Sequence, residues 1–187
     1  MILQRKTPMI KLLSRLIVNI NKFNNKVLAF LQLQTLKHGH NCKNRGGGSF
    51  FQGNIELGNN VIIGRSATFL STGAKLTIKD NVLIAPHCTI ITGDHQVNQV
   101  GKYIFDVQEK TEICDKDVII EDDSWIGANV TILKGVTIAR GSVIGAGSVV
   151  TKSTEPYSIN AGNPCRKIKM RFTNDQIKEH ERILNIR

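Results

Sequence analysis

The sequence predicts an all-β solenoid, a parallel β-helix built from six-residue repeats. An aliphatic residue stands at every sixth position from 120 to 150, namely Ile120, Ile126, Ile132, Ile138, Ile144 and Val150. An α-helix repeats near 3.6 residues and a strand near two, so neither explains this period. A coil with three flat faces explains it, because one hexapeptide then covers each face and points its aliphatic residue into a stacked core. The small residues between these positions let the chain turn at each corner.

The same period can be followed upstream. It runs through Leu57, Ile63 and Phe69 and, after three extra residues near 75–77, resumes at Ile78, Ile84 and Ile90. Segments 51–91 and 120–155 therefore predict about four complete coils, stacked roughly 4.8 Å apart. The repeat breaks between residues 92 and 119, which predicts a long extruded loop. A loop of this length in a regular fold is usually functional.

A basic helical segment, residues 1–48, is expected to precede the β-helix domain 49–172. Residues 1–48 hold nine Lys or Arg and no Asp or Glu, whereas the remaining 139 residues hold 16 basic and 15 acidic side chains. Apolar residues recur at three- and four-residue steps over 8–37, which predicts an amphipathic helix. Two interpretations remain open. The helix covers the open end of the solenoid or packs on a neighbouring subunit, or it lies on an anionic membrane surface.

Other features of the sequence limit the possible partners and the cellular compartment. Interleaved aromatic residues and a recognisable binding module are missing, so nucleic acid is not an expected partner. The four cysteines form no CxxC pair and have no His partner at metal spacing, which favours reduced thiols in the cytoplasm. Apolar stretches near the start are too short for a membrane span or a signal sequence. Residues 173–187 are charged and predict a short, exposed C-terminal helix that includes His180.

Three motifs carry a resemblance to a known family. Residues 125–132 (WIGANVTI), 143–152 (VIGAGSVVTK) and 161–168 (AGNPCRKI) resemble the hexapeptide-repeat acetyltransferases. That family includes maltose and galactoside, serine, antibiotic and polysaccharide acetyltransferases. The resemblance covers roughly residues 50–172. It implies a left-handed parallel β-helix, a homotrimer with active sites between subunits, and acetyl-CoA as acyl donor, with no metal required.

Acyl transfer from a thioester needs a base for the acceptor hydroxyl or amine, and histidine suits that role near neutral pH. His95 stands at the start of the predicted loop, in residues 92–95 (TGDH), and matches the catalytic histidine of the family. His38 and His40 fall in a basic connector. His87 falls within a regular hexapeptide, where a corner position is expected.

Asp94 is the second candidate catalytic residue, expected to orient the imidazole or to bind acceptor hydroxyls. Neighbouring side chains on an extended segment point in opposite directions, so a direct pair with His95 is not assured. The loop carboxylates Asp106, Glu109 and Glu112 remain alternative partners. The resemblance places no Ser or Cys nucleophile, which favours direct transfer over a covalent acyl-enzyme.

The resemblance also implies binding residues for the coenzyme and the acceptor. Ala128 and Ala146 match positions that line the donor groove of the family, and Thr151 and Lys152 stand where the family contacts the nucleotide end of the coenzyme. Cations for the phosphates are offered by Arg166 and Lys169, with Lys167 between them. Arg65 and Trp125 are the candidate acceptor-binding residues.

The leading hypothesis is O-acetylation of a sugar hydroxyl in bacterial surface polysaccharide biosynthesis, in the cytoplasm or at the inner face of the membrane. The helical cap of the maltose and galactoside enzymes is not recognisable, and Arg65 and Gly73 replace polar residues that grip the sugar there. An alternative is a small soluble acceptor, such as serine, an antibiotic or an amino sugar. A non-catalytic scaffold and a carbonic anhydrase-like metalloenzyme are also open, although the latter needs three convergent His ligands.

Overall fold

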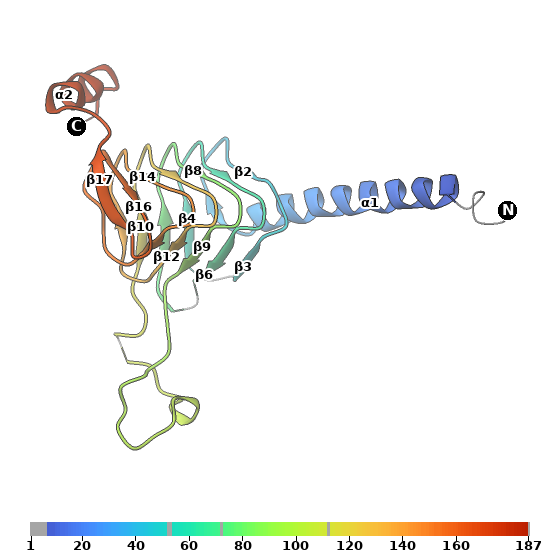
Figure 1. Cartoon of the computed structure of the whole chain (residues 1–187), viewed down its shortest axis with the longest axis horizontal. Coiled ribbons are helices and arrows are strands. Elements are labelled where there is room, and N and C mark those ends of the chain that lie inside the picture. The colour runs from blue at the N-terminus through green and yellow to red at the C-terminus, as the bar shows by residue number, and fades with distance from the viewer. Residues whose placement is uncertain (1–6, 52–53, 72, 112, 187) are drawn as a thin grey trace.

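The computed structural model describes residues 7–51, 54–71, 73–111 and 113–186, with the backbone alone for 7–11 and 51. Figure 1 shows a solenoid with a helix projecting from one end, a loop leaving its side and a short helix at the other end. The predicted parallel β-helix is therefore confirmed, together with its N-terminal helix, extruded loop and C-terminal helix.

Three sheets form the faces of the solenoid, and neighbouring strands are parallel except for the last pair. Sheet A holds β1 (Lys37–His38), β4 (Ile55–Leu57), β7 (Leu76–Ile78), β10 (Val118–Ile120) and β13 (Thr137–Ile138). Sheet B holds β2 (Lys43–Asn44), β5 (Ile62–Ile63), β8 (Leu83–Ile84), β11 (Trp125–Ile126), β14 (Val143–Ile144), β16 (Ser158–Ala161) and the antiparallel β17 (Arg166–Met170). Sheet C holds β3 (Ser49–Phe51), β6 (Thr68–Leu70), β9 (Thr89–Ile91), β12 (Thr131–Ile132) and β15 (Val149–Val150).

The solenoid begins earlier than the sequence predicts. Strands β1, β2 and β3 make a coil of their own, so the described residues form five complete coils rather than about four. The expected boundary at residue 49 is wrong, and the first coil starts at Lys37. It escaped the sequence pattern because β1 and β2 carry Lys, His and Asn, while the core beneath them is filled partly by Leu33 and Leu36 of the preceding segment.

The predicted inward residues form the core. Ile120, Ile126, Ile132 and Ile138 are fully buried, and Ile144 and Val150 are 1% exposed. The upstream series is equally buried, and Phe69 stacks on Phe50 with ring centroids 4.7 Å apart. Each such side chain contributes roughly 1.5–3 kcal/mol relative to exposure, so the stacked columns are the main source of stability.

Residues with a left-handed backbone turn the corners, and they stack at the same place in successive coils. Between sheets A and B these are Asn41, Asn60, Asn81, Asp123 and Gly141, and between sheets B and C they are Gly47, Ser66, His87, Asn129 and Gly147. Asn and Gly tolerate this conformation best. The Asn side chains also hydrogen-bond from coil to coil, at 2.9 and 2.8 Å. His87 is a corner residue, as predicted.

Helix α1 (Thr7–Gln34) covers the open end of the core with its last turns. Ala29, Leu33 and Leu36 are buried there, and the Gln32 side-chain amide donates to the carbonyl of Gly48 at 3.0 Å. This confirms the capping interpretation for the C-terminal part of α1. The rest of the helix projects away from the solenoid (Figure 1). In the described part of the chain, no helix is both long and apolar enough to span a bilayer.

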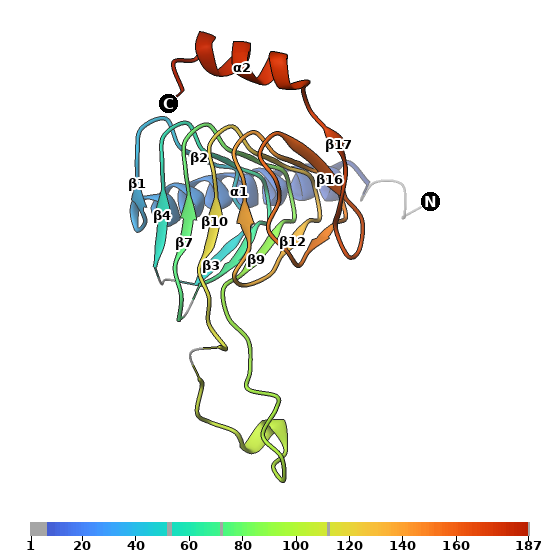
Figure 2. The same cartoon turned by 90° about the vertical axis from the view of Figure 1, so that its left-hand side faces the viewer.

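At the opposite end β16 and β17 extend sheet B, and Cys165 between them packs on the core. Helix α2 (Asn174–Ile183) follows and begins with a capping box between Thr173 and Gln176. The predicted exposed helix is present and none of its residues is buried, but its His180 is only partly exposed. Its ring lies 5.9 Å from that of Tyr157 and 5.1 Å from that of Phe172, because α2 folds back over the last coils (Figure 2).

Two leucines near the end of α1 test the capping role. Leu33 is 7% exposed and Leu31 is 51% exposed, although they lie two residues apart. We expect Leu33→Ala to lower the free energy of unfolding by about 2–4 kcal/mol, because it opens a cavity above the first coil. Leu31→Ala should change it by less than about 0.5 kcal/mol. Denaturant unfolding of both variants measures the difference, and equal effects would contradict the capping role.

Candidate active site

The extruded loop leaves and re-enters the solenoid through a narrow neck. The backbone N–H of Asp94 donates to the carbonyl of Cys114 at 2.9 Å, and that of Lys116 donates to Thr92 at 2.8 Å. Beyond this neck the loop extends well away from the sheets, with a short 3-10 helix η2 (Ile104–Asp106) near its tip (Figure 2). The neck therefore fixes the backbone next to His95, while the far part of the loop is free of the solenoid within one chain.

Lys134 holds both sides of the neck from the coil below. Its Nζ donates to Asp94 Oδ1 at 2.6 Å and to the carbonyl oxygens of Ile113 at 2.7 Å and Cys114 at 3.2 Å. The Asp94 carboxylate is thus paired with Lys134 in this structure. Sequence reasoning missed Lys134, because a lysine in a hexapeptide corner is unremarkable until the register places it beneath the loop.

A hollow of about 140 Å³ opens beside the neck. It is lined by Asp94, His95, Gln96, Val97, Asn98, Thr111, Ile113, Cys114 and Lys134. His95 is exposed there, and its imidazole makes no hydrogen bond to the residues that the structure describes. An imidazole with a free ring nitrogen can accept a proton from a hydroxyl group that enters the hollow.

The alternative carboxylate partners of His95 do not reach this hollow. Asp106 and Glu109 are exposed in the distal part of the loop and do not line it, and Glu112 lies outside the described residues. Asp94 is thus the one described carboxylate in its lining. Burial raises the pKa of Cys88 and Cys165, which disfavours the nucleophilic thiolate form of these two side chains, and neither lines the hollow.

The candidate coenzyme residues lie on a different edge of the solenoid. Ala128 and Ala146 stack at the corners between sheets B and C, where the N–H of Gly147 donates to the carbonyl of Ala128 at 2.8 Å. The two coils approach each other closely at Gly127. A Cβ at this position would lie 2.6 Å from the backbone nitrogen of Ala146, so a larger residue would not fit without a shift. The loop with His95 instead leaves the corner between sheets C and A.

A second hollow, of about 160 Å³, lies at the C-terminal end of the solenoid and brings Lys152 and Arg166 together. Lys167 also lines it, but its Nζ is held by Glu155 at 2.6 Å. Thr151 and Lys169 are exposed and are not part of this lining. The structure therefore groups two of the four polar residues expected at the coenzyme.

The two candidate acceptor residues lie apart from His95 within one chain. Trp125 is 52% exposed on the outer face of sheet B, paired with Leu83 and Val143. Arg65 is exposed at a corner between sheets B and C and lines a hollow beside α1. Neither side chain lines the hollow at His95.

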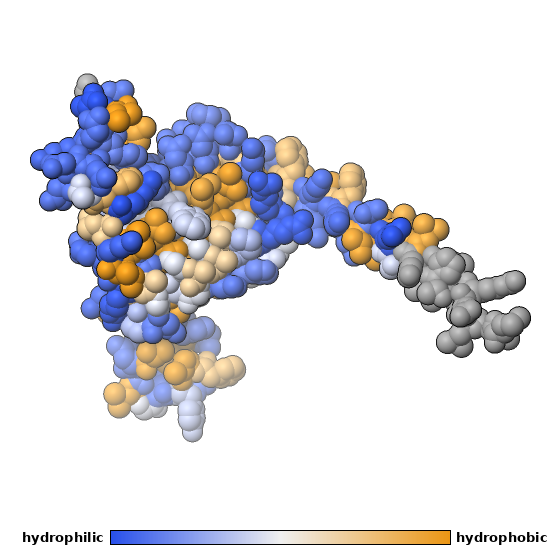
Figure 3. Space-filling model, turned by 45° about the horizontal axis from the view of Figure 1, so that its top comes forward, coloured by the Kyte–Doolittle hydropathy of each residue, from blue (hydrophilic) through white to orange (hydrophobic). Residues whose placement is uncertain are grey.

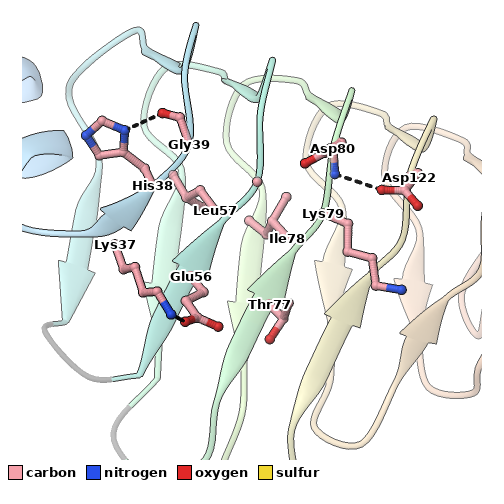
Figure 4. A pocket seen from close by; sticks show the side chains of 11 residues that line it. Lys37, His38, Gly39, Glu56, Leu57, Thr77, Ile78, Lys79, Asp80 and Asp122 are labelled. Atoms are coloured by element: carbon pink, nitrogen blue, oxygen red, sulfur yellow. Dashed lines mark hydrogen bonds and ion pairs between the residues drawn. The ribbon is translucent and has the colours of Figure 1, made fainter.

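A larger hollow of about 500 Å³ runs along the outside of sheet A (Figure 4). Its carboxylates and lysines have hydrogen-bond or ion-pair partners in the lining or beside it. Glu56 accepts hydrogen bonds from Lys37 and Lys75, which lower its pKa to about 2, and the Asp80 N–H donates to Asp122 Oδ1 at 2.9 Å. The imidazole of His38 also lines this surface, where its Nδ1 lies 2.7 Å from the carbonyl oxygen of Gly39. The described residues also contain no group of three His, Cys, Asp or Glu side chains that could hold a metal ion.

Comparison with known proteins agrees with this architecture. Residues 117–152 match the family model described as bacterial transferase hexapeptide (six repeats). The crystal structure of a hexapeptide-repeat acetyltransferase from Vibrio cholerae superimposes with a TM-score of 0.71 and 31% sequence identity, over 86% of this chain and 89% of that one. The chain belongs to the hexapeptide-repeat acetyltransferase family.

Curated members of the family differ in the acceptor that their names state. The chain is 46% identical to a polysialic acid O-acetyltransferase from Escherichia coli O1:K1 / APEC, over 60% of this chain and 37% of that protein. It is 36% identical to a probable macrolide acetyltransferase from Lysinibacillus sphaericus, over 54% of this chain and 66% of that protein. The chain thus spans between about a third and two thirds of the length of these relatives. The Vibrio cholerae protein has also been solved in complex with acetyl-CoA, at 30% identity over 74% of this chain and 72% of that one, with a TM-score of 0.60.

The role of Lys134 in holding the neck can be tested by removing its ammonium group. Lys134→Met should open the neck. It removes the donor to Asp94 Oδ1, the donor to the Ile113 carbonyl and one of the two donors to the Cys114 carbonyl, and each lost charged hydrogen bond costs about 1.5–3 kcal/mol. We expect amide exchange at Asp94 and Lys116 to accelerate at least tenfold. Lys102→Met removes the same charge from the exposed part of the loop and should leave that exchange unchanged. Unaltered exchange in Lys134→Met would show that the structure of the neck does not depend on the hydrogen bonds of Lys134.

Proposed function

We propose that the chain is an acetyl-CoA-dependent O-acetyltransferase that acts on a sugar hydroxyl, with His95 as general base. The observation that carries the proposal is the exposed imidazole of His95 in the hollow at the loop neck, which has no hydrogen-bond partner among the described residues, on the solenoid of an acetyltransferase family. His95 takes the proton of the acceptor hydroxyl while its oxygen attacks the thioester carbonyl. The C–S bond then breaks, and the coenzyme thiolate leaves and recovers the proton from His95.

Asp94 has a supporting role in this proposal. Lys134 occupies one of its carboxylate oxygens, at 2.6 Å. The other oxygen is proposed to accept a hydrogen bond from a second hydroxyl of the acceptor and so to hold the reacting hydroxyl near His95. A sugar, which carries neighbouring hydroxyl groups, suits this arrangement better than an isolated alcohol does.

For the coenzyme, we propose that the pantetheine arm lies along the corners at Ala128 and Ala146, where small side chains let it approach the backbone. Lys152 and Arg166, which share the C-terminal hollow, are proposed to bind phosphate groups, since ammonium and guanidinium groups both suit phosphate. Thr151 and Lys169 remain proposed contacts at the nucleotide end. The acetyl-CoA complex of the Vibrio cholerae relative supports acetyl-CoA as the donor.

The site is proposed to lie between subunits of a homotrimer. Within one chain, the coenzyme corners and the loop with His95 lie on different edges of the solenoid, so a second copy is needed to bring them together. A row of apolar side chains on the outer face of sheet B supports such packing. Leu83 and Trp125 are 48% and 52% exposed in this row, and Trp125 pairs in register with Leu83 on one side and Val143 on the other. Arg65 and Trp125 would reach the acceptor from the neighbouring copy.

The proposed acceptor is a bacterial surface polysaccharide or its lipid-linked precursor. The relative named polysialic acid O-acetyltransferase supports a polymeric sugar. The basic segment 1–48 supports presentation at the inner face of the membrane, which would make the enzyme cytoplasmic with a peripheral membrane contact. The relative named probable macrolide acetyltransferase favours a second candidate, a small soluble acceptor.

His95→Ala tests the chemistry. Turnover of acetyl-CoA in the presence of an acceptor, followed by release of free thiol, should fall at least about 100-fold, the usual contribution of a general base. Coenzyme affinity should stay the same. His87→Asn is the matched control, because Asn tolerates the positive φ of 61° at that corner and the change removes a histidine outside the hollow. Equal turnover in His95→Ala and the wild type would remove His95 from the mechanism.

Lys152→Gln tests the coenzyme site. We expect the dissociation constant for acetyl-CoA, measured by calorimetry, to rise about fivefold to tenfold, because one charge-assisted hydrogen bond to phosphate is lost. Lys178→Gln removes the same charge from the exposed face of α2 and should leave the affinity unchanged. If both variants bind acetyl-CoA as the wild type does, Lys152 is not a coenzyme contact.

A further inference from the structure

Helix α1 carries a broad apolar stripe that the solenoid leaves uncovered. Its side chains are between 41% and 69% exposed, and they are Leu12, Leu13, Leu16, Ile17, Ile20, Phe23, Val27, Leu28, Phe30 and Leu31. At 3.6 residues per turn these positions occupy one side of the helix, over an arc of roughly 160°. Figure 3 shows apolar side chains along the projecting part of α1, clear of the solenoid.

The stripe points away from the solenoid because the helix packs with its other side. Ala29 and Leu33, which are buried against the first coil, lie on the face opposite the stripe. Arg15, Lys22 and Lys26 share that opposite face. The cap therefore uses the polar side of α1, and the apolar side is left for another partner.

The charge of the segment indicates what that partner is. Residues 1–36, which precede the first coil, hold six basic side chains and no acidic one, so the counter-charge must come from outside the segment. An interfacial membrane helix has this composition, with aromatic and aliphatic residues on one face and Lys or Arg on the other. With 28 residues α1 is long enough to span a bilayer, but it is not apolar enough.

We propose that α1 binds an anionic lipid surface, lying in the plane of the interface with its apolar stripe among the acyl chains. Arg15, Lys22 and Lys26 would then face the lipid phosphates from the rim and the outer side of the helix. Since α1 continues from the first coil, this contact would hold the solenoid and its loop beside the membrane. The lipid contact itself does not depend on the proposed function. Only its role, delivery of a lipid-linked acceptor to the site, rests on that function.

A second copy of the chain fits the stripe less well. A coiled-coil seam is narrower than this stripe, and identical helices commonly align through pairs of acidic and basic residues at its edges. The described part of α1 has no acidic residue to pair with Lys26 of another copy. Bringing copies together would instead gather like charges without a counter-charge. The observations therefore favour lipid.

Two β-branched residues on opposite sides of α1 allow a matched test. Ile20 lies in the stripe and is 50% exposed, whereas Val18 lies on the other side and is 49% exposed. The full-length protein is sedimented with vesicles of phosphatidylcholine alone or mixed with phosphatidylglycerol. We expect binding to the mixed vesicles, a loss of about tenfold or more in Ile20→Glu, and a loss of no more than about threefold in Val18→Glu.

A third variant separates charge from burial. Replacing Lys22 and Lys26 by Gln should weaken binding to the anionic vesicles about fivefold per lysine and leave the weak binding to neutral vesicles unchanged. The proposal is overturned if the wild type ignores anionic vesicles, or if Ile20→Glu and Val18→Glu lose binding equally. It is also overturned if Ile20→Glu lowers the molecular mass of the assembly measured by sedimentation equilibrium, since the stripe of the wild type would then be covered by another copy.

This test does not depend on acyl transfer. Vesicle binding needs neither coenzyme nor acceptor, so it can fail while the wild type still acetylates a soluble sugar in a reaction that needs His95. Conversely, a protein that binds vesicles but releases no thiol with any sugar would keep the lipid contact and lose the proposed function.

Discussion

The stacked columns of inward-pointing aliphatic side chains hold this molecule together, and the other features depend on them. A coil packs only on the coils above and below it, so an uncovered coil would expose its core to water. Leu33 and Leu36 cover the first coil, while Cys165, between β16 and β17, packs on the core at the last. Because the columns must remain continuous, an insertion can leave the solenoid only at a corner. The long loop that carries His95 does so between β9 and β10, and the columns on either side remain in register.

This constraint explains how a regular scaffold can support chemistry. The inward positions are committed to packing, so functional groups must come from corners, from the outer faces and from the loop. Lys134 is such a corner residue, and it fixes the loop neck through three hydrogen bonds. The neck in turn sets the position of His95 relative to the solenoid. The corners at Ala128 and Ala146 belong to another edge, and for this reason the proposed active site needs more than one copy of the chain.

Much of the fold could be predicted because the buried position of each six-residue repeat requires an aliphatic residue, and this period is visible in the sequence. Ile126 and Ile132 were identified in this way, and so were the place of the loop and the corner at His87. The first coil could not be found, since β1 and β2 are polar and the core beside them is filled by Leu33 and Leu36, which come earlier in the sequence. Lys134 and the partial burial of His180 also escaped prediction. Both depend on contacts between residues far apart in the chain, Lys134 with Asp94 and His180 with Tyr157.

The candidate site was predictable to a lesser extent. The position of His95 at the loop mouth follows from the end of the repeat, and the structure places its side chain in a hollow with Asp94. The pairing of Asp94 with Lys134 rather than with His95 was not visible in the sequence. Among the binding residues, Lys152 and Arg166 meet in one hollow, whereas Arg65 and Trp125 lie apart from His95 in a single chain.

The most direct test of the central claim is the release of free thiol from acetyl-CoA by the wild-type protein with a panel of acceptors. The panel should contain soluble sugars, acidic polysaccharides and lipid-linked oligosaccharides, beside serine, an amino sugar, a macrolide and chloramphenicol. The account predicts acceptor-dependent release with a saccharide, and mass spectrometry should find the acetyl group on a hydroxyl oxygen. Release with the antibiotics, the amino acid or the amine alone, and with none of the hydroxyl saccharides, would contradict it.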